Sequence, residues 1–381
     1  MQCHSNVSAF LLTNKDYHIL KWGIAMSVNN THDFFIQWHI TEKCNLRCLH
    51  CYQEDRLPAE LPLKSMKEVI NEAADMIWDW EETYGVKIPM SYNISGGEPL
   101  LRSDLFEILE EISWKGADIY ILSNGTRITK EIARKLARNR VSGVQVSIEG
   151  PQKIHEDIRG KGSFAASISG VKNLLSSGIP VTLNATLSTL NAGCFPEMVS
   201  LSKSLGVQKL GFSRLVPYGR GAAMLDKMIA VDEVKKLYRN IFSADASPVR
   251  IVTGDPVASQ FSMNEVTEDM GDTAIGGCAA GVSGMTILAD GTITPCRRLN
   301  IPIGNVLEDS LREVWSVSPV LEALRDRKRY EGRCGSCKRW ANCRGCRAIA
   351  YAYSKANGKE NYLSEDPQCY IEDHPVPGIP Q

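Results

Sequence analysis

Three features are missing from this chain of 381 residues, and each absence excludes a class of protein. No apolar run approaches the ~20 residues that a membrane-spanning helix needs. No concentrated basic patch is visible, because 43 lysines and arginines are scattered among 44 acidic residues. No secretory signal is present, since the short apolar stretch at 8–13 is followed by Lys15 and Asp16. We therefore expect a cytoplasmic protein with no membrane and no nucleic-acid partner.

Cysteine, by contrast, is abundant, with twelve in the chain. In a reducing compartment so many thiols indicate metal or redox chemistry and not a disulfide framework. The cysteines also fall into two groups. The first group is Cys44, Cys48 and Cys51; the second is Cys278, Cys296, Cys334, Cys337, Cys343, Cys346 and Cys369; Cys3 and Cys194 stand alone.

Between residues 34 and 252, segments typical of strands alternate with segments typical of helices. The predicted strands are 34–40, 88–95, 117–123, 141–149, 179–187 and 207–216, and the predicted helices between them are 66–85, 104–114, 129–139, 163–177 and 195–205. Strands separated by helices of ~10–15 residues indicate βαβ units and a parallel sheet. We expect an α/β fold, a partial (β/α)6 TIM-like barrel over 34–254, with an N-terminal extension at 1–33 and a Cys-rich domain at 255–381.

In a barrel of this kind, chemistry gathers where the carboxyl ends of the strands meet. The first cysteine group follows strand 34–40, and "SGGEP" follows strand 88–95. "SNGT" and "SIEG" come at the ends of the next two strands. In the Cys-rich region, "GMTILADGTITPC" predicts a β-hairpin that turns at Asp290 and Gly291, and the sparse apolar periodicity beyond it favours stabilisation by metal.

The spacing C-x3-C-x2-C in "CNLRCLHC" can wrap a compact cluster, and thiolates are the ligands that iron–sulfur clusters require. Three thiolates leave one iron of a four-iron cubane without a protein ligand. An open coordination position is what a substrate or cofactor uses. Zinc is the alternative, with His50 as a fourth ligand, but zinc sites prefer ligand pairs at other spacings.

This loop resembles that of the radical SAM superfamily, in which a 4Fe-4S cluster binds S-adenosylmethionine and its reductive cleavage yields a 5'-deoxyadenosyl radical. The resemblance implies that Glu98 receives the cofactor's amino group and that later strand ends contact its carboxylate, ribose and adenine. The implied cofactor-binding residues are Gly96, Gly97, Glu98, Pro99, Ser123, Asn124, Ser147, Arg159 and Leu215. Turn formation by the Gly- and Asn-containing motifs, and a surface ion pair for Arg159, are the alternatives.

The second group contains C-x2-C-x5-C-x2-C at 334–346 and resembles the SPASM extension of this superfamily, which binds auxiliary clusters. A zinc ribbon is the alternative, but ribbons separate their pairs by ~15–20 residues. The resemblance implies an outer cluster held by Cys334, Cys337, Cys343 and Cys369, and an inner one held by Cys278, Cys296 and Cys346. Three 4Fe-4S clusters follow in all. The inner cluster lacks one thiolate, so another side chain or a substrate atom completes it.

The resemblance implies a radical SAM oxidoreductase that modifies a peptide or small protein, such as a maturase that forms thioether or other crosslinks in a ribosomal peptide. The stretch "HEDIRGKGSF" at 155–164 favours peptide substrates, and a donor such as flavodoxin or ferredoxin supplies electrons. Formylglycine formation, as in anaerobic sulfatase maturases, is disfavoured because no further cysteine follows closely after Cys278. Tetrapyrrole side-chain modification is a further alternative. A non-catalytic electron-transfer module is disfavoured by the open three-cysteine site.

Overall fold

The structure, a computed structural model, describes residues 33–261 and 271–372. The predicted extension at 1–33 lies outside the described residues except for Asp33, as does Cys3. The strands are β1 (Phe34–His39), β2 (Met90–Ser95), β3 (Asp118–Ser123), β4 (Gly143–Ser147), β5 (Val181–Leu187), β6 (Lys209–Arg214), β7 (Arg250–Thr253), β8 (Gly284–Ile287), β9 (Thr292–Thr294) and β10 (Gly304–Asn305). The helices are α1 (Leu63–Tyr84), α2 (Leu105–Trp114), α3 (Lys130–Arg138), α4 (Gln152–Arg159), α5 (Ser163–Ser176), α6 (Phe195–Leu205), α7 (Val231–Ser243), α8 (Leu311–Val317), α9 (Pro319–Arg325), α10 (Gly332–Ser336) and α11 (Arg347–Ala356).

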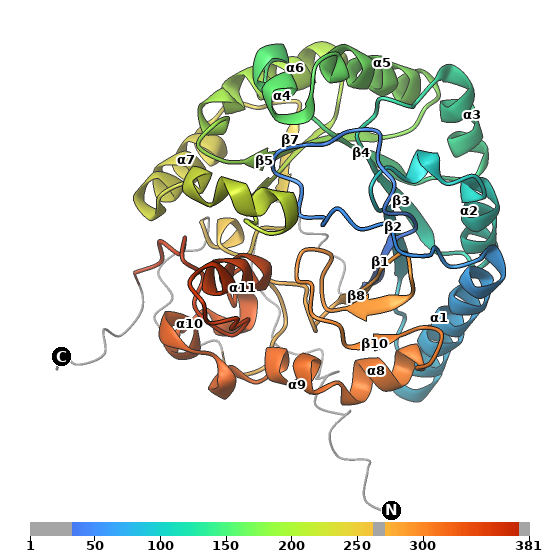
Figure 1. Ribbon diagram of the computed structural model, residues 1–381, viewed down its shortest axis with the longest axis vertical. Helices are drawn as coiled ribbons and strands as arrows, with labels where there is room; N and C mark the ends of the chain where they lie inside the picture. Colours follow the sequence, from blue (N-terminus) through green and yellow to red (C-terminus); the bar gives the residue numbers. More distant parts are fainter. Residues whose placement is uncertain (1–32, 262–270, 373–381) are drawn as a thin grey trace, which may run out of the picture.

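Strands β1 to β7 pair in parallel and in chain order, and the helices between them form an outer ring around the strands (Figure 1). All six predicted strands are present, which confirms the α/β barrel-like class. Helices α4 and α7 and the four-residue strand β7 were not among the predicted elements. Helix α4 and strand β7 are short, and in α7 polar residues interrupt the apolar pattern.

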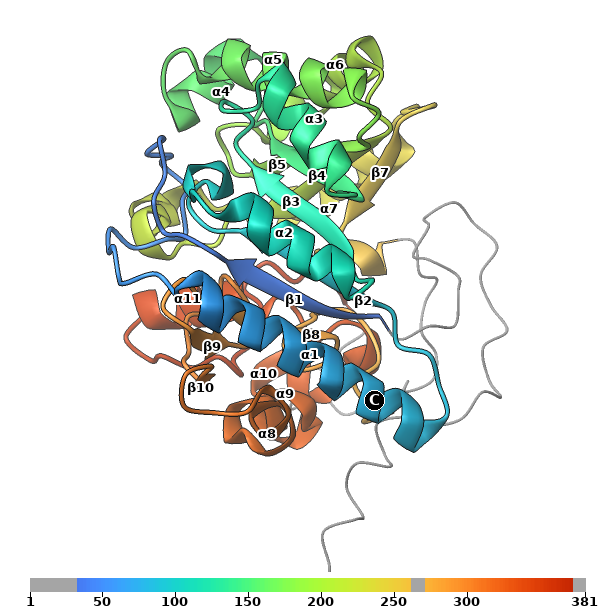
Figure 2. The same ribbon diagram turned by 90° about the vertical axis from the view of Figure 1, so that its right-hand side faces the viewer.

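The sheet continues from the other edge of β1 into the Cys-rich region. Strand β8 pairs in parallel with β1, and β9 pairs antiparallel with β8, so the predicted hairpin at Asp290 and Gly291 is confirmed. Gly284 makes this approach possible, because a Cβ atom there would lie 2.3 Å from the Phe35 carbonyl oxygen. The two predicted domains therefore share one sheet, and α8–α11 gather on the side of β1 away from β4–β7 (Figure 2).

Strand β1 shows how the sheet separates an apolar layer from a polar interior. Ile36 and Trp38 are fully buried in the hydrophobic core between the sheet and the helices. Gln37 alternates with them and donates from Nε2 to Ser95 Oγ at 2.6 Å. Successive side chains of a strand point to opposite faces of the sheet. The face of β1 opposite the hydrophobic core therefore presents polar groups such as Gln37. In the described part of the chain, no helix is long and apolar enough to cross a membrane.

Candidate active site

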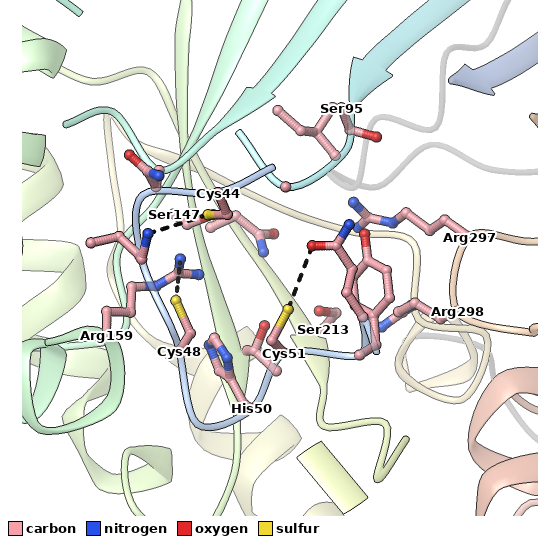
Figure 3. Close-up of a pocket in the computed structure, with 18 of the residues that line it drawn as sticks. Cys44, Cys48, His50, Cys51, Ser95, Ser147, Arg159, Ser213, Arg297 and Arg298 are labelled. Atoms are coloured by element: carbon pink, nitrogen blue, oxygen red, sulfur yellow. Dashed lines mark hydrogen bonds between the residues drawn. The ribbon is translucent and has the colours of Figure 1, made fainter. Parts of the chain in front are cut away.

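The loop after β1 brings all three cysteines of the first group to one cavity (Figure 3). This cavity holds about 920 Å³ of space free of protein atoms, its open mouth included. Cys44, Cys48 and Cys51 all line it, and none forms a disulfide. Two backbone hydrogen bonds fix the loop: Leu49 N donates to Ile158 O at 2.9 Å, and Cys51 N donates to Cys48 O at 3.3 Å.

A buried carboxylate, Glu149, organises one side of this loop. Its Oε1 accepts from Arg159 Nε at 2.8 Å and Nη2 at 2.5 Å and lies 2.9 Å from His50 Nε2, while Oε2 accepts from Thr186 N at 2.8 Å. Burial alone would raise the pKa of Glu149, but Arg159 and His50 hold it well below its usual range. Arg159 also directs Nη1 toward Cys48 Sγ at 3.6 Å. Glu149 thus positions the cysteine loop through two side chains.

The predicted glycine-rich segment lies against the start of the same loop. Gly96 and Gly97 line the cavity. A Cβ atom at Gly96 would meet Thr41 O at 2.1 Å, and one at Gly97 would meet Lys43 O at 2.2 Å. Gly97 N also donates to Thr41 O at 2.8 Å. The glycines are therefore required for close packing of two backbone segments, in addition to their place in the cavity wall.

Glu98, the predicted acceptor of the cofactor's amino group, does not line the cavity. It is fully buried and accepts from Ser123 Oγ and Asn124 N, each at 2.8 Å. Burial raises the pKa of Glu98 to about 7, against the lowering effect of these two donors. The structure thus gives Glu98 an internal role that joins the segment after β2 to the end of β3. Pro99 and Leu215 are also buried and do not line the cavity.

The other predicted cofactor-binding residues do face the cavity. Ser123, Asn124, Ser147 and Arg159 line it from the ends of β3, β4 and α4. Asn124 Nδ2 donates to Asn45 Oδ1 at 3.0 Å, so this side chain also ties β3 to the cysteine loop. Six of the nine predicted residues, counting Gly96 and Gly97, therefore meet in one place.

Sequence reasoning missed several residues that line the cavity or support its wall. Glu149 has a visible signal, since it is a carboxylate at the end of an apolar strand pattern. Tyr52 and Gln53 directly follow the third cysteine; Tyr52 Oη lies 3.2 Å from His39 Nε2, and burial raises the pKa of Tyr52 to about 12. Arg297 and Arg298 directly follow Cys296, and only the fold shows that they reach the cavity.

Four cysteines of the second group interact with one another in the C-terminal region. Burial raises the pKa of Cys343 well above its ordinary value, and the neighbouring Cys369, Cys334 and Cys337 raise it further. Burial also raises the pKa of Cys369 to about 12, with a smaller contribution from Cys334. Thiols that disfavour one another's ionisation in this way lie close together. These four are the residues predicted to hold the outer cluster.

The three remaining cysteines are Cys278, Cys296 and Cys346, and two of them lie near Arg298, which lines the cavity. Burial raises the pKa of Cys346 to about 12; Arg298 lowers it, and Cys278 raises it. Cys296 and Cys346 both interact electrostatically with the Arg298 guanidinium. The two sets remain linked, because Cys278 N donates to Cys343 O at 3.1 Å. The assignment of these ligands to an inner cluster stays a prediction.

A buried ion network holds the Cys-rich region to the barrel. Arg214, at the end of β6, donates to Asp255 Oδ2 at 2.6 Å and to Asp366 Oδ2 at 2.8 Å. All three side chains are at most 3% exposed. Asp366 Oδ2 also accepts from Cys346 N at 2.8 Å, so the network reaches the inner cysteines directly.

The donor chemistry of both cysteine groups fits iron–sulfur clusters. All eleven described cysteines are free, and soft thiolates are the usual ligands of such clusters. Within residues 33–261 and 271–372, no three His, Cys, Asp or Glu side chains converge closely enough to hold a single metal ion. The fit therefore rests on the number and the type of the thiols and on the one cavity that Cys44, Cys48 and Cys51 line.

A barrel-like parallel sheet whose first loop brings three thiols to one cavity, beside a second thiol-rich region, is typical of an iron–sulfur enzyme of the α/β-barrel class. The chain belongs to the radical SAM superfamily. The model of that superfamily matches residues 38–201, and the model of the iron–sulfur cluster-binding SPASM domain matches residues 278–347.

Known proteins resemble this chain over most of its length. The AdoMet-dependent heme synthase of Methanosarcina barkeri is 32% identical over 88% of this chain and 95% of its own. The mycofactocin maturase MftC of Mycobacterium tuberculosis is 29% identical over 90% of this chain and 84% of its own. The crystal structure of Streptococcus suis SuiB bound to S-adenosylmethionine shares the fold, with a TM-score of 0.70 at 18% identity over 90% of this chain and 78% of that one.

Proposed function

We propose that this protein uses S-adenosylmethionine and three 4Fe-4S clusters to oxidise a peptide or small protein, with a thioether or other crosslink as the product. The observation that supports this most is that one cavity is lined both by the cysteines of the loop after β1 and by residues next to Cys296. When bound, the clusters and S-adenosylmethionine supply a hydrogen-abstracting radical and an electron acceptor. A substrate in the cavity lies between the two cysteine groups that would hold them.

The residues of the chain supply positioning. Glu149, Arg159 and His50 fix the cysteine loop. Ser123, Asn124 and Ser147 offer hydroxyl and amide groups for the polar parts of S-adenosylmethionine. Glu98 accepts hydrogen bonds from Ser123 Oγ and Asn124 N and so holds these two residues in place. We do not propose that Glu98 contacts S-adenosylmethionine directly.

A second hollow beside the cavity favours a peptide substrate. It holds about 840 Å³, its open part included, and shares Arg220 with the cavity wall. Its lining includes Glu54, Tyr218 and Lys355, so it offers both charge and an aromatic surface. An extended chain segment lying there reaches the cavity past Arg220. We infer a cytoplasmic setting and a reduced flavodoxin or ferredoxin as electron donor.

Tetrapyrrole side-chain modification is the second candidate, and the relatives favour it. The heme synthase of Methanosarcina barkeri is 32% identical, and a protein of the same organism named Fe-coproporphyrin III synthase is 27% identical. Both candidates use the same cysteine loop and cofactor. They differ in what enters the cavity.

Anaerobic reconstitution tests the shared part of the proposal. The reduced protein with S-adenosylmethionine is expected to release 5'-deoxyadenosine, and a protein with full iron occupancy that releases none would refute the enzymatic function. The substrate is then tested by mass spectrometry with two candidates: a short peptide encoded beside the gene, and Fe-coproporphyrin III. Loss of two hydrogens from the peptide supports the first candidate, and a changed tetrapyrrole side chain supports the second.

A further inference from the structure

Two arginines reach the cavity from the Cys-rich region. Arg297 and Arg298 follow Cys296 and project toward Cys51 from the side opposite Arg159 and Cys48 (Figure 3). Both guanidinium groups carry a permanent positive charge. They enter a space whose other polar groups come mainly from the strand ends of the barrel.

The other arginines that line the cavity form ion pairs with carboxylates of the chain. Their pairs are Arg159 with Glu149 at 2.5 Å, Arg214 with Asp255 at 2.6 Å and Asp366 at 2.8 Å, and Arg220 with Asp55 at 2.5 Å. In each pair a charged hydrogen bond joins the guanidinium to a carboxylate, which is the strong type of polar contact. Arg159 and Arg214 are therefore held by buried carboxylates, whereas Arg220 shares the half-exposed Asp55 with Arg47.

Arg297 and Arg298 lack such a partner. Within the described ranges, Arg297 makes no ion pair, and its guanidinium lies over the Tyr52 ring at 5.7 Å from the centroid. Arg298 donates from Nη1 only to the Arg214 carbonyl oxygen at 3.4 Å, and its buried Nε has no hydrogen-bond partner. An arginine fork of this kind matches a carboxylate with two parallel hydrogen bonds.

The inner cysteines account for only part of this positive charge. Arg298 lies near the thiols of Cys296 and Cys346 and near the carboxylate of Asp255, and these groups balance some of its charge. Arg297 instead lies over Tyr52, beside the third cysteine of the loop. Arg298 thus lies beside the second cysteine group and Arg297 beside the first. The guanidinium of Arg297 has no carboxylate partner among the described residues and is available to a ligand.

We propose that Arg297 and Arg298 bind a carboxylate of the substrate and so hold the substrate between the two cysteine groups. This inference rests on the proposed function and adds the chemical class of the substrate. The carboxylate belongs either to a peptide, at its C-terminus or on an acidic side chain, or to the propionate of a tetrapyrrole. Both sources present the same group to the same two forks.

Binding to the reconstituted, S-adenosylmethionine-loaded protein tests the proposal with two matched pairs of probes. One pair is a fluorescent hexapeptide with a free C-terminal carboxylate and its C-terminal amide. The other is an iron porphyrin with free propionates and its methyl ester. At least one free-carboxylate probe should bind about tenfold or more tightly than its neutral partner. The pair that shows this preference identifies the source.

Variants assign the preference to these residues. Arg297→Gln and Arg298→Gln should lose most of the preference for the free carboxylate. Arg297→Lys should retain part of it, because the positive charge remains but the planar guanidinium is lost. Arg329→Gln, at an exposed position, should retain all of it. Iron content and release of 5'-deoxyadenosine without substrate should stay within about twofold of wild type in the control variant Arg329→Gln, whose side chain lies outside the cavity. That release also separates failure of the proposed function from failure of this inference.

Three results would overturn the proposal. The first is equal binding of charged and neutral probes in both pairs. The second is a carboxylate preference that survives both Gln variants. The third is an Arg297→Gln variant that loses iron or binds S-adenosylmethionine about tenfold more weakly, since Arg297 would then serve a cluster or the cofactor and not the substrate.

Discussion

Removing the charge of Glu149 should loosen the cysteine loop without touching a cysteine. Glu149→Gln keeps the size of the side chain but leaves the guanidinium of Arg159 without its counter-ion. Glu149 is fully buried and Arg159 is 11% exposed. Breaking a buried pair on one side costs about 3–5 kcal/mol, and we take about 3 kcal/mol because Arg159 borders the cavity. That cost corresponds to roughly a hundredfold increase in the open, cluster-releasing state of the loop.

The assay is loss of iron to a chelator from anaerobically reconstituted protein, followed together with release of 5'-deoxyadenosine. Glu149→Gln should lose about four irons per chain far faster than wild type, while the remaining irons leave at the wild-type rate. Asp157→Asn is the matched control, because its exposed pair with Lys153 lies on the same helix as Arg159 and contacts nothing in the cavity. Wild-type iron retention and activity in Glu149→Gln would refute the positioning role.

Three further predictions concern the rest of the molecule. Wild-type protein should hold about twelve irons per chain and Cys334→Ala about eight by chemical analysis; equal values would contradict the outer cluster. Asp366→Asn should lower the urea-measured free energy of unfolding by about 3 kcal/mol, because Arg214 loses a buried counter-ion, whereas exposed Asp226→Asn should not. Glu98 binds its proton more tightly when folded, since its pKa rises from 4.5 to about 7; its contribution to stability therefore grows by roughly 3 kcal/mol as pH falls through that window. The test is the difference in the free energy of unfolding between wild type and Glu98→Gln, measured with urea at several pH values. A difference that does not change with pH would contradict the prediction.

The sequence predicted the barrel well because strand and helix periodicities are local signals. Strand β1 (Phe34–His39) and helix α1 (Leu63–Tyr84) lie within a few residues of their predicted bounds. Strand β7 (Arg250–Thr253) was missed because four residues carry too little pattern. The pairing of β8 with β1 was also out of reach, since it joins residues about 250 apart in the chain through backbone contacts that leave no periodic trace.

Motifs located the site more accurately than they assigned individual roles. The three cysteines and Asn124 were placed correctly in one cavity because strand ends of a parallel sheet meet. Glu98 was assigned to the cofactor from its motif, but burial behind Ser123 depends on how the segment packs. The ion pairing that leaves Arg297 free of carboxylates depends on three other arginines and their partners, and no short sequence window contains that information.

The open sheet explains why the Cys-rich region can complete the cavity. Strands β7 and β10 are the two edges of the sheet and do not pair with each other. The segment after β9 crosses this open side toward the end of β6: Arg298 Nη1 donates to Arg214 O, Asn300 Nδ2 donates to Tyr218 Oη at 3.3 Å, and Leu299 packs in one cluster with Val216. Arg297 and Arg298 of this segment therefore line the cavity, and Arg297 also lies over the ring of Tyr52, which directly follows the last cysteine of the loop. If Arg297 and Arg298 bind the substrate as proposed, substitutions at these two positions should alter substrate choice while Cys44, Cys48 and Cys51 stay unchanged.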